Sequence, residues 1–209
     1  MSGYVLHDYY RSSASYRVRI ALNLKGLEYR LHDVSLIEGA QRSEEHLARS
    51  AQGFVPVLEL DGGRMLTQSL AIIDWLDAAH REPQLTPADP LARADTMARA
   101  LLIACDIHPL NNLRVLKRLK HQFDATDAQR DDWYRHWVAE GFSALERMAG
   151  DGRYLGGDAP DLSDVCLVPQ MFNARRFEMD LSPYPRLVAI DAALQALPAV
   201  SAAHPDAAR

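Results

Sequence analysis

Hydrophobic positions in the first 80 residues change their spacing several times, from the period of two typical of strands to the three-to-four spacing of helices. Tyr4-Val5-Leu6 is a short β-prone run. Residues 15–25 have helical spacing, and Gly26 follows at the C′ position, where many helices end on glycine. A second strand is expected within residues 27–34, followed by a helical piece. This stretch therefore predicts the order β-α-β.

A hairpin and a further helix complete this half of the chain. Residues 56–60 alternate with period two, Asp61-Gly62-Gly63 has the composition of a tight turn, and residues 64–67 return as a second strand. Residues 69–79 then resume helical spacing. Together these elements predict a thioredoxin-like domain over residues 1–80, with a small sheet flanked by helices.

The pattern changes after residue 80. Three prolines within a short polar stretch predict a linker at residues 81–90, and the rest of the chain has helical spacing only. Helices are predicted over residues 91–123 with an interruption at His108-Pro109, over 127–149, from Asp161 onward with Asp164 near the third position, and over 185–197. The alanine-rich tail from Ala199 is expected to be frayed.

The fold class predicted from these patterns is a two-domain protein, α/β followed by an all-α bundle at residues 91–209. Trp133, Trp137, Phe142 and Leu145 recur at helical spacing and are interpreted as core positions. Small-molecule sites often lie between two domains, so a cleft site is expected.

Composition narrows the function. The formal net charge is -5, and the sequence lacks the basic surface that nucleic-acid binding requires. No apolar run approaches the roughly 20 residues of a membrane span, and the first residues do not resemble a secretory signal. Cys105 and Cys166 lie in separate helical patterns without metal-ligand spacing, and are interpreted as small hydrophobes of a reducing compartment. We expect a cytoplasmic protein without a metal site, a nucleic-acid partner or a membrane partner.

Arg11-Ser12-Ser13 lies between the first strand and the first helix. Free amides at a helix N-terminus, the helix dipole and nearby hydroxyls suit a bound anion. If that anion is a thiolate, the same groups lower the pKa of the thiol. The simpler alternatives are an N-capping serine and a solvated arginine. No cysteine lies in this turn, so a thiol acting here must come with a ligand.

Two further places in the first half suit a small peptide. Val55-Pro56 precedes a strand, and a cis bond there would present the Val55 main chain for strand-like pairing; an ordinary trans edge proline is the alternative. Gln68-Ser69 precedes a helix whose N-terminus suits a carboxylate, with plain capping as the alternative. Together, the anion site at Ser12, the main chain at Val55 that can pair with a strand, and the carboxylate site at Ser69 fit a small peptide. Such a peptide would have a thiol at one end and a carboxylate at the other.

The helical half contains candidate substrate residues. His108 and Asn112 are four residues apart near Pro109, which is expected to kink a helix and leave carbonyls unpaired; a satisfied core histidine is the alternative. The basic positions from Arg114 to Lys120 are interpreted as a solvated face. Arg175-Arg176 ends the third helical pattern, where an arginine can bind a carboxylate in bidentate geometry or simply complement the helix dipole.

These motifs resemble zeta-class glutathione transferases over nearly the whole chain. The matching stretches are Arg11-Ser-Ser-Ala-Ser-Tyr-Arg-Val-Arg-Ile-Ala-Leu-Asn-Leu-Lys-Gly26, Val55-Pro56, Gln68-Ser-Leu-Ala-Ile-Ile73, His108-Pro-Leu-Asn-Asn112, Leu167-Val-Pro-Gln170, Arg176-Phe177 and Asp180-Leu-Ser-Pro-Tyr-Pro185. The resemblance implies a glutathione-transferase fold and glutathione as a catalytic cofactor. It implies the isomerisation of maleylacetoacetate, a step of aromatic amino-acid catabolism, or the similar isomerisation of maleylpyruvate.

The resemblance also assigns roles. Ser12, with Ser13 beside it, would stabilise the glutathione thiolate. Val55 and Pro56 would pair with the peptide, and Gln68 and Ser69 would hold its γ-glutamyl end. The remaining assignments concern the substrate cleft: His108 and Asn112 would line it, Arg11 and Arg176 would bind the carboxylates of a small diacid, and Asp106 would reach glutathione in the partner subunit of a homodimer.

Three departures from the family pattern qualify this picture. Ala14 replaces the usual cysteine, for which we expect a change in rate or specificity. Ser50-Ala51-Gln52-Gly53-Phe54 replaces the usual Asn-Pro loop, which puts its glutathione contacts in doubt. Leu113 stands where maleylpyruvate enzymes carry arginine, which favours maleylacetoacetate. The alternatives are maleylpyruvate isomerisation, a general transferase or dehalogenase activity, and a thioredoxin-like binding module without catalysis.

Overall fold

The computed structural model describes residues 3–208, and the chain divides into two compact units. The first unit contains the chain up to Leu85 together with the segment from Ala196 onward, and the second contains Thr86–Gln195. The sequence placed this C-terminal segment in the helical domain. By its contacts it belongs instead to the first unit.

A four-stranded mixed sheet forms the centre of the first unit. Its strands are β1 (Tyr4–Asp8), β2 (Tyr29–Asp33), β3 (Val57–Glu59) and β4 (Met65–Thr67), in the order β2-β1-β3-β4. β1 runs parallel to β2 and antiparallel to β3, with Leu6 opposite Leu58, and both of these side chains are fully buried. This is the predicted thioredoxin-like arrangement, and the β3–β4 pair is the predicted hairpin.

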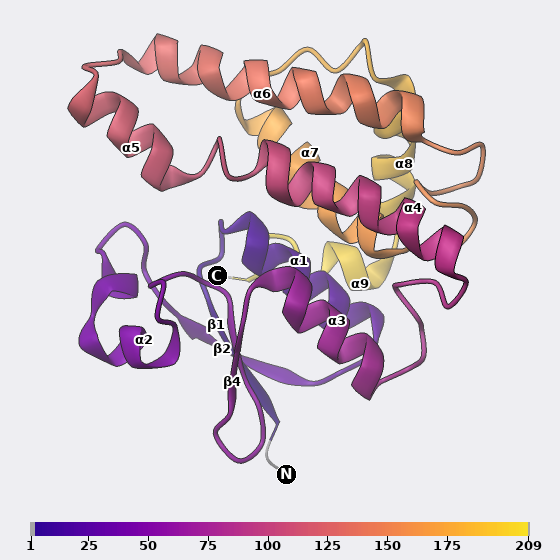
Figure 1. The fold of residues 1–209 in the computed structure, drawn as a ribbon, viewed down its shortest axis with the longest axis horizontal. Helices are drawn as coiled ribbons and strands as arrows, with labels where there is room; N and C mark the ends of the chain where they lie inside the picture. Colours follow the sequence, from indigo (N-terminus) through magenta and orange to yellow (C-terminus); the bar gives the residue numbers. More distant parts are fainter. Residues whose placement is uncertain (1–2, 209) are drawn as a thin grey trace. The chain divides into compact units, whose positions relative to one another are not determined.

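Helices α1 (Ser13–Leu24) and α3 (Ser69–Ala79) pack side by side, whereas the short helices η1 (Ala40–Arg42) and α2 (Glu44–Arg49) lie apart from that pair (Figure 1). α1 ends where predicted, because Gly26 adopts the left-handed conformation with φ +64°. Its central residues are buried on nearly every side. α1 is thus a core helix of this unit.

The C-terminal segment packs against α1. The short helix α9 (Pro198–Ser201) lies there, Asn23 Nδ2 donates to the Ala199 carbonyl at 3.0 Å, and Arg19 Nε donates to the Ala203 carbonyl at 3.0 Å. Ala203 is fully buried. The expectation of a frayed tail was therefore wrong, because side chains almost two hundred residues away satisfy its carbonyls.

The second unit is all-helical. It consists of α4 (Pro90–Leu101), the π-helix η2 (Leu102–Ile107), α5 (Leu113–Gln122), α6 (Asp127–Met148), α7 (Leu162–Arg176) and α8 (Pro185–Gln195). α7 contacts both α4 and α8 and is buried along most of its length. None of the helices in residues 3–208 is both long enough and apolar enough to cross a bilayer.

The interruption near His108 is larger than a proline kink. The chain leaves η2 at His108, and Asn112 caps α5 by accepting the Arg114 N–H at 3.1 Å. His108 and Asn112 therefore do not share one helical face, as their spacing had predicted. Local turns also bond the carbonyls there, since His108 O accepts the Asn111 N–H at 3.2 Å.

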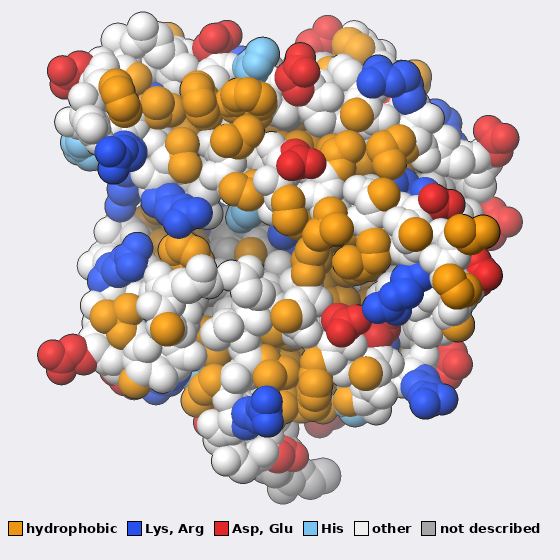
Figure 2. Space-filling model, viewed as in Figure 1, with side chains coloured by type: hydrophobic (Ala, Val, Ile, Leu, Met, Phe, Trp, Pro, Cys, Tyr) orange, Lys and Arg blue, Asp and Glu red, His pale blue; other side chains and the backbone are white. Residues whose placement is uncertain are grey.

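Helix α5 lies at the surface and contacts α6. None of its residues is buried, and its basic side chains are exposed, which confirms the predicted solvated face. Figure 2 shows hydrophobic side chains along α5 and α6 with Lys and Arg side chains beside them. On α6, Phe142 and Leu145 are fully buried as predicted, whereas Trp133 and Trp137 are only half-buried.

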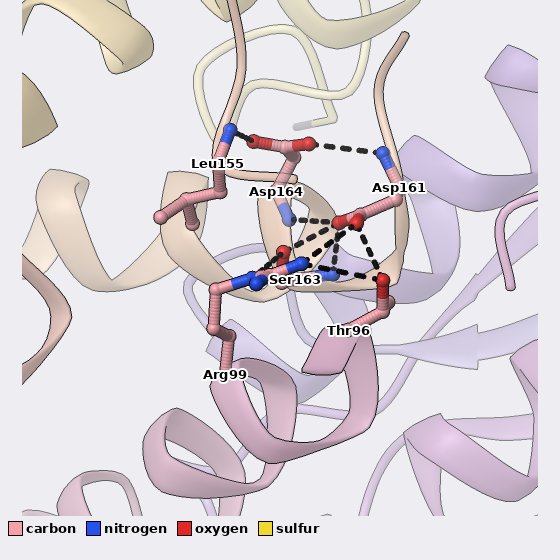
Figure 3. A network of polar contacts seen from close by, with 6 residues as sticks. All are labelled: Thr96, Arg99, Leu155, Asp161, Ser163 and Asp164. Atoms are coloured by element: carbon pink, nitrogen blue, oxygen red, sulfur yellow. Dashed lines mark hydrogen bonds and ion pairs between the residues drawn. The ribbon is translucent and has the colours of Figure 1, made fainter. Parts of the chain in front are cut away.

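A polar network fixes the start of α7 (Figure 3). Asp161 caps the helix by accepting the Ser163 N–H at 2.8 Å, and Asp164 accepts the Asp161 N–H at 2.9 Å, so the two residues cap the helix start reciprocally. The other Asp164 oxygen accepts the Leu155 N–H at 2.9 Å, and Thr96 donates to Asp161 at 2.8 Å. The network ties the preceding loop and α4 to the buried helix.

Burial, with the adjacent Asp161 charge, raises the pKa of Asp164 to about 7. The folded state therefore binds this proton more tightly than the unfolded state, so this contribution to stability is present at acidic pH and is lost as pH rises toward 7.

We predict that Asp164→Asn lowers the free energy of unfolding by about 1–3 kcal/mol, because an amide leaves one of two buried N–H groups without an acceptor. The difference from the unchanged protein should narrow between pH 5 and pH 8, since only the carboxyl titrates. Urea unfolding at both pH values measures this.

Asp158→Asn is the matched control, because exposed Asp158 accepts the Arg153 N–H at 3.1 Å in the same loop. An equal loss in both variants, or a gap that widens at high pH, would contradict the role given to Asp164.

Candidate functional site

Ser12 occupies the N-cap of α1. Its N–H donates to the Tyr9 carbonyl at 2.7 Å, and its Oγ accepts the Ser15 N–H at 3.3 Å. The hydroxyl oxygen thus caps the helix, while the hydroxyl hydrogen can still be donated to another acceptor. No acidic residue lies in the first turn of α1, so no carboxylate of the helix itself neutralises its positive end. Capping and anion binding are therefore compatible in one serine.

The neighbours of Ser12 differ in exposure. Ser13 is buried at 7% exposure, whereas Ser12 is half-buried and Arg11 is exposed. The Arg11 guanidinium carbon lies 5.2 Å from the centre of the Tyr10 ring, close enough for a cation–π contact. Of the two serines, Ser12 is the more open to a ligand.

The Val55–Pro56 peptide bond is cis, the alternative that the sequence had left open. The Val55 side chain packs against Tyr9 and Val34. Within residues 3–208, no hydrogen bond is found for the Val55 N–H or carbonyl. The main chain just before β3 therefore has pairing capacity for an extended peptide.

Gln68 and Ser69 lie at the start of α3. Gln68 has φ +68° and ψ +113°, an unfavourable backbone conformation for a residue with a Cβ. Its Nε2 donates to Gln52 Oε1 at 2.6 Å, so the loop that departs from the family pattern contacts this position directly. As in α1, no acidic residue lies in the first turn of α3.

Arg17 of α1 lies behind Ser69. Its Nη1 donates to Ser69 Oγ at 3.4 Å, and both residues are buried, at 2% and 6% exposure. Arg17 Nε and Nη2 are buried without a hydrogen-bond partner among the described residues. Arg17 had no role assigned from the sequence. The available signal was the Arg-Val-Arg run at Arg17–Arg19, which lies inside a helix whose central residues are buried.

In the second unit, the candidate residues lie around the break between η2 and α5. Asp106 is exposed, and His108 and Asn112 are half-buried. Asn112 Oδ1 is used in capping α5, which leaves its amide hydrogens as donors. These three positions share one irregular segment.

The two arginines that end α7 have different partners. Arg175 pairs with buried Asp191 at 2.6 Å. No ion pair of Arg176 is found with another described residue; its guanidinium carbon lies 5.0 Å from the centre of the Phe177 ring. Phe177 in turn stacks on Tyr134, with ring centres 3.7 Å apart. Arg176 is therefore the arginine with charge available for a carboxylate.

Burial raises the pKa of Tyr134 to about 12, an increase that the nearby Arg176 charge partly offsets. Tyr134 is neutral at physiological pH and therefore does not neutralise the charge of Arg176.

In residues 3–208, no cluster of His, Cys, Asp or Glu is arranged to hold a metal ion.

Comparison with known proteins gives a consistent family assignment. Residues 6–84 match the model of the glutathione S-transferase N-terminal domain. The maleylacetoacetate isomerase of Rhizobium meliloti (strain 1021) is 48% identical over 208 residues, which cover 98% of this chain and 97% of that protein. The chain belongs to the zeta class of the glutathione transferases.

Solved zeta-class structures agree with this fold. A holo structure of maleyl pyruvate isomerase, described as a bacterial zeta-class glutathione S-transferase, has a TM-score of 0.94 at 42% identity and covers 97% of both chains. The maleylacetoacetate isomerase from Anaeromyxobacter dehalogenans 2CP-1 with glutathione bound in its active site has a TM-score of 0.88 at 42% identity, with 98% and 96% coverage. The predicted family, the two-part fold and glutathione as cofactor are confirmed at the level of the family.

Proposed function

We propose that this zeta-class chain catalyses the glutathione-dependent cis–trans isomerisation of maleylacetoacetate to fumarylacetoacetate. The observation that carries the proposal is the end-to-end likeness to the maleylacetoacetate isomerase of Rhizobium meliloti. Leu113, at the start of α5, supports this substrate over maleylpyruvate, for which the family pattern has an arginine.

The first unit fits glutathione in three places. The Ser12 hydroxyl has a hydrogen to donate to a thiolate, the Val55 main chain has pairing capacity for the peptide, and Ser69 begins a helix with no acidic residue in its first turn. Buried nitrogens of Arg17 without partners add positive charge behind Ser69. Gln68 and Ser69 are proposed to hold the γ-glutamyl end, and Val55 with Pro56 the peptide bonds.

Bound glutathione supplies a thiolate, which adds reversibly to the conjugated double bond and so permits rotation about it. Ser12 donates its hydroxyl hydrogen to the sulfur, and the start of α1 adds dipole charge; both favour the thiolate over the thiol. Arg11 and Arg176 bind the carboxylates of the diacid and hold it for attack. Ser13 supports the turn, and His108 and Asn112 supply polar contacts to the substrate.

We further propose that the enzyme is a cytoplasmic homodimer in which Asp106 contacts glutathione bound in the partner subunit. Asp106 is exposed at the end of a π-helix, as this role requires. Ala14, half-buried in the first turn of α1, is proposed to change rate or specificity while Ser12 retains the thiolate role.

We predict that kcat/KM in the presence of glutathione is higher for maleylacetoacetate than for maleylpyruvate, because Leu113 offers no charge to the shorter acid. Leu113→Arg should shift the ratio toward maleylpyruvate, with Val115→Arg on the same helix as the matched control. A preference for maleylpyruvate in the unchanged protein would assign the alternative substrate. Turnover of an α-halo acid without isomerisation of either diacid would assign a dehalogenase.

A second prediction concerns Ser12. Ser12→Ala should raise the pKa of the bound thiol by about one to two pH units, because one hydrogen bond to the charged sulfur is lost. Isomerisation at neutral pH should fall by about 100-fold. Thiolate absorbance measured against pH gives the pKa directly.

Ser13→Ala is the matched variant for this test, and Ser12→Thr should restore a low pKa by restoring the hydroxyl. An unchanged pKa in Ser12→Ala, or an equal rise in both alanine variants, would refute the role given to Ser12.

A further inference from the structure

Three basic side chains are buried along α1 and at its end. Arg19 pairs with Asp8 at 2.6 Å, and Lys25 pairs with Asp77 at 2.7 Å. For Arg17 no ion pair is found with any described residue, although it is only 2% exposed. The same helix therefore carries two compensated cations and one uncompensated cation.

The hydrogen bonds of Arg17 are equally incomplete. Its Nη1 reaches Ser69 Oγ at 3.4 Å, a long contact, while Nε and Nη2 have no partner among the described residues. A buried guanidinium without a counterion is unfavourable for folding. A group retained in that state is expected to act in binding, where a ligand supplies the missing negative charge.

The contact with Ser69 indicates which ligand group this is. Arg17 donates to the Ser69 oxygen, so the hydroxyl hydrogen is directed to a different acceptor. Ser69 is the first residue of α3, an 11-residue helix with no acidic residue in its first turn. A hydroxyl donor, a helix N-terminus and a buried cation together favour a carboxylate.

We propose that Arg17 is a positioning residue for the α-carboxylate of the γ-glutamyl group of glutathione. It acts through Ser69, by orienting the hydroxyl and by raising the positive potential there, and it does not touch the ligand. This inference rests on the proposed glutathione site at Ser69. It predicts that Arg17 lowers the stability of the free protein while it raises affinity for one carboxylate.

The test uses the full-length protein and two ligands, glutathione and its analogue 4-aminobutyryl-Cys-Gly, which lacks the γ-glutamyl α-carboxylate. Arg17→Met should weaken glutathione binding by about tenfold, measured by calorimetry, because a charge acting on the carboxylate is lost. Binding of the analogue should change by less than about twofold. Urea unfolding without ligand should show Arg17→Met to be at least as stable as the unchanged protein.

Arg17→Lys retains the charge and should recover part of the preference for glutathione over the analogue. Arg17→Gln retains hydrogen-bond donors without charge and should lose that preference as Arg17→Met does, which provides a second variant should the methionine protein fail to fold. Arg19→Met is the matched control, because it strands the buried Asp8 carboxylate and should lower stability.

Ser69→Ala separates this inference from the site on which it rests. Weakened glutathione binding in Ser69→Ala with unchanged binding in the Arg17 variants would overturn the role of Arg17 alone. Unchanged binding in Ser69→Ala would overturn the Ser69 site itself. Equal weakening of both ligands by Arg17→Met, together with lost stability, would show a structural role only.

Discussion

Uncompensated positive charge at two helix N-termini is the constraint on which the first unit depends. α1 and α3 begin at Ser12 and Gln68-Ser69, and neither has an acidic residue in its first turn. Arg17 adds a buried guanidinium next to Ser69. The polypeptide thus retains positive charge that its own residues do not neutralise, which is unfavourable in the free protein and favourable when an anionic peptide binds. On the proposed account, glutathione supplies both missing anions, a thiolate and a carboxylate.

Several other buried charged side chains in residues 3–208 do have partners. Asp8 and Asp77 each have a basic partner, and the Asp161–Asp164 pair is surrounded by donors from the helix, the preceding loop and α4. These ion pairs and hydrogen bonds serve the fold. Among the described residues, no ion pair is found for the buried Arg17 beside Ser69 or for Arg176 at the end of α7. Arg17 and Arg176 therefore have positive charge that a ligand can neutralise.

Local chemistry predicted the elements that depend on neighbours in sequence. The turn at Asp61-Gly62-Gly63 and the left-handed Gly26 determine the hairpin and the end of α1, and both were read correctly. The break near His108 was underestimated, because a π-helix precedes it. The packed tail was missed, because its hydrogen bonds come from Arg19 and Asn23, which are remote in sequence.

The candidate site was predicted only in part, because only some of its features depend on residues that are neighbours in sequence. Serines before helices and the Val55-Pro56 step are visible as local patterns, and family resemblance supplied their roles. Which basic side chains are available to a ligand depends on the ion pairs that form in the folded chain. Asp191 engages Arg175 and leaves Arg176 available, and the lack of a carboxylate beside Arg17 is evident only in three dimensions. A sequence pattern names basic residues but does not show which of them lack a counterion.

In the proposed reaction the thiolate of glutathione adds to the substrate and is released again with the product, so glutathione is not consumed. The most direct measurement is to incubate the enzyme with excess maleylacetoacetate and a small, limiting amount of glutathione, and to follow free thiol and trans product together. We expect many molecules of fumarylacetoacetate for each glutathione, with the free thiol unchanged at the end. Product that stops at one equivalent of glutathione, with matching loss of thiol, would contradict it and indicate conjugation.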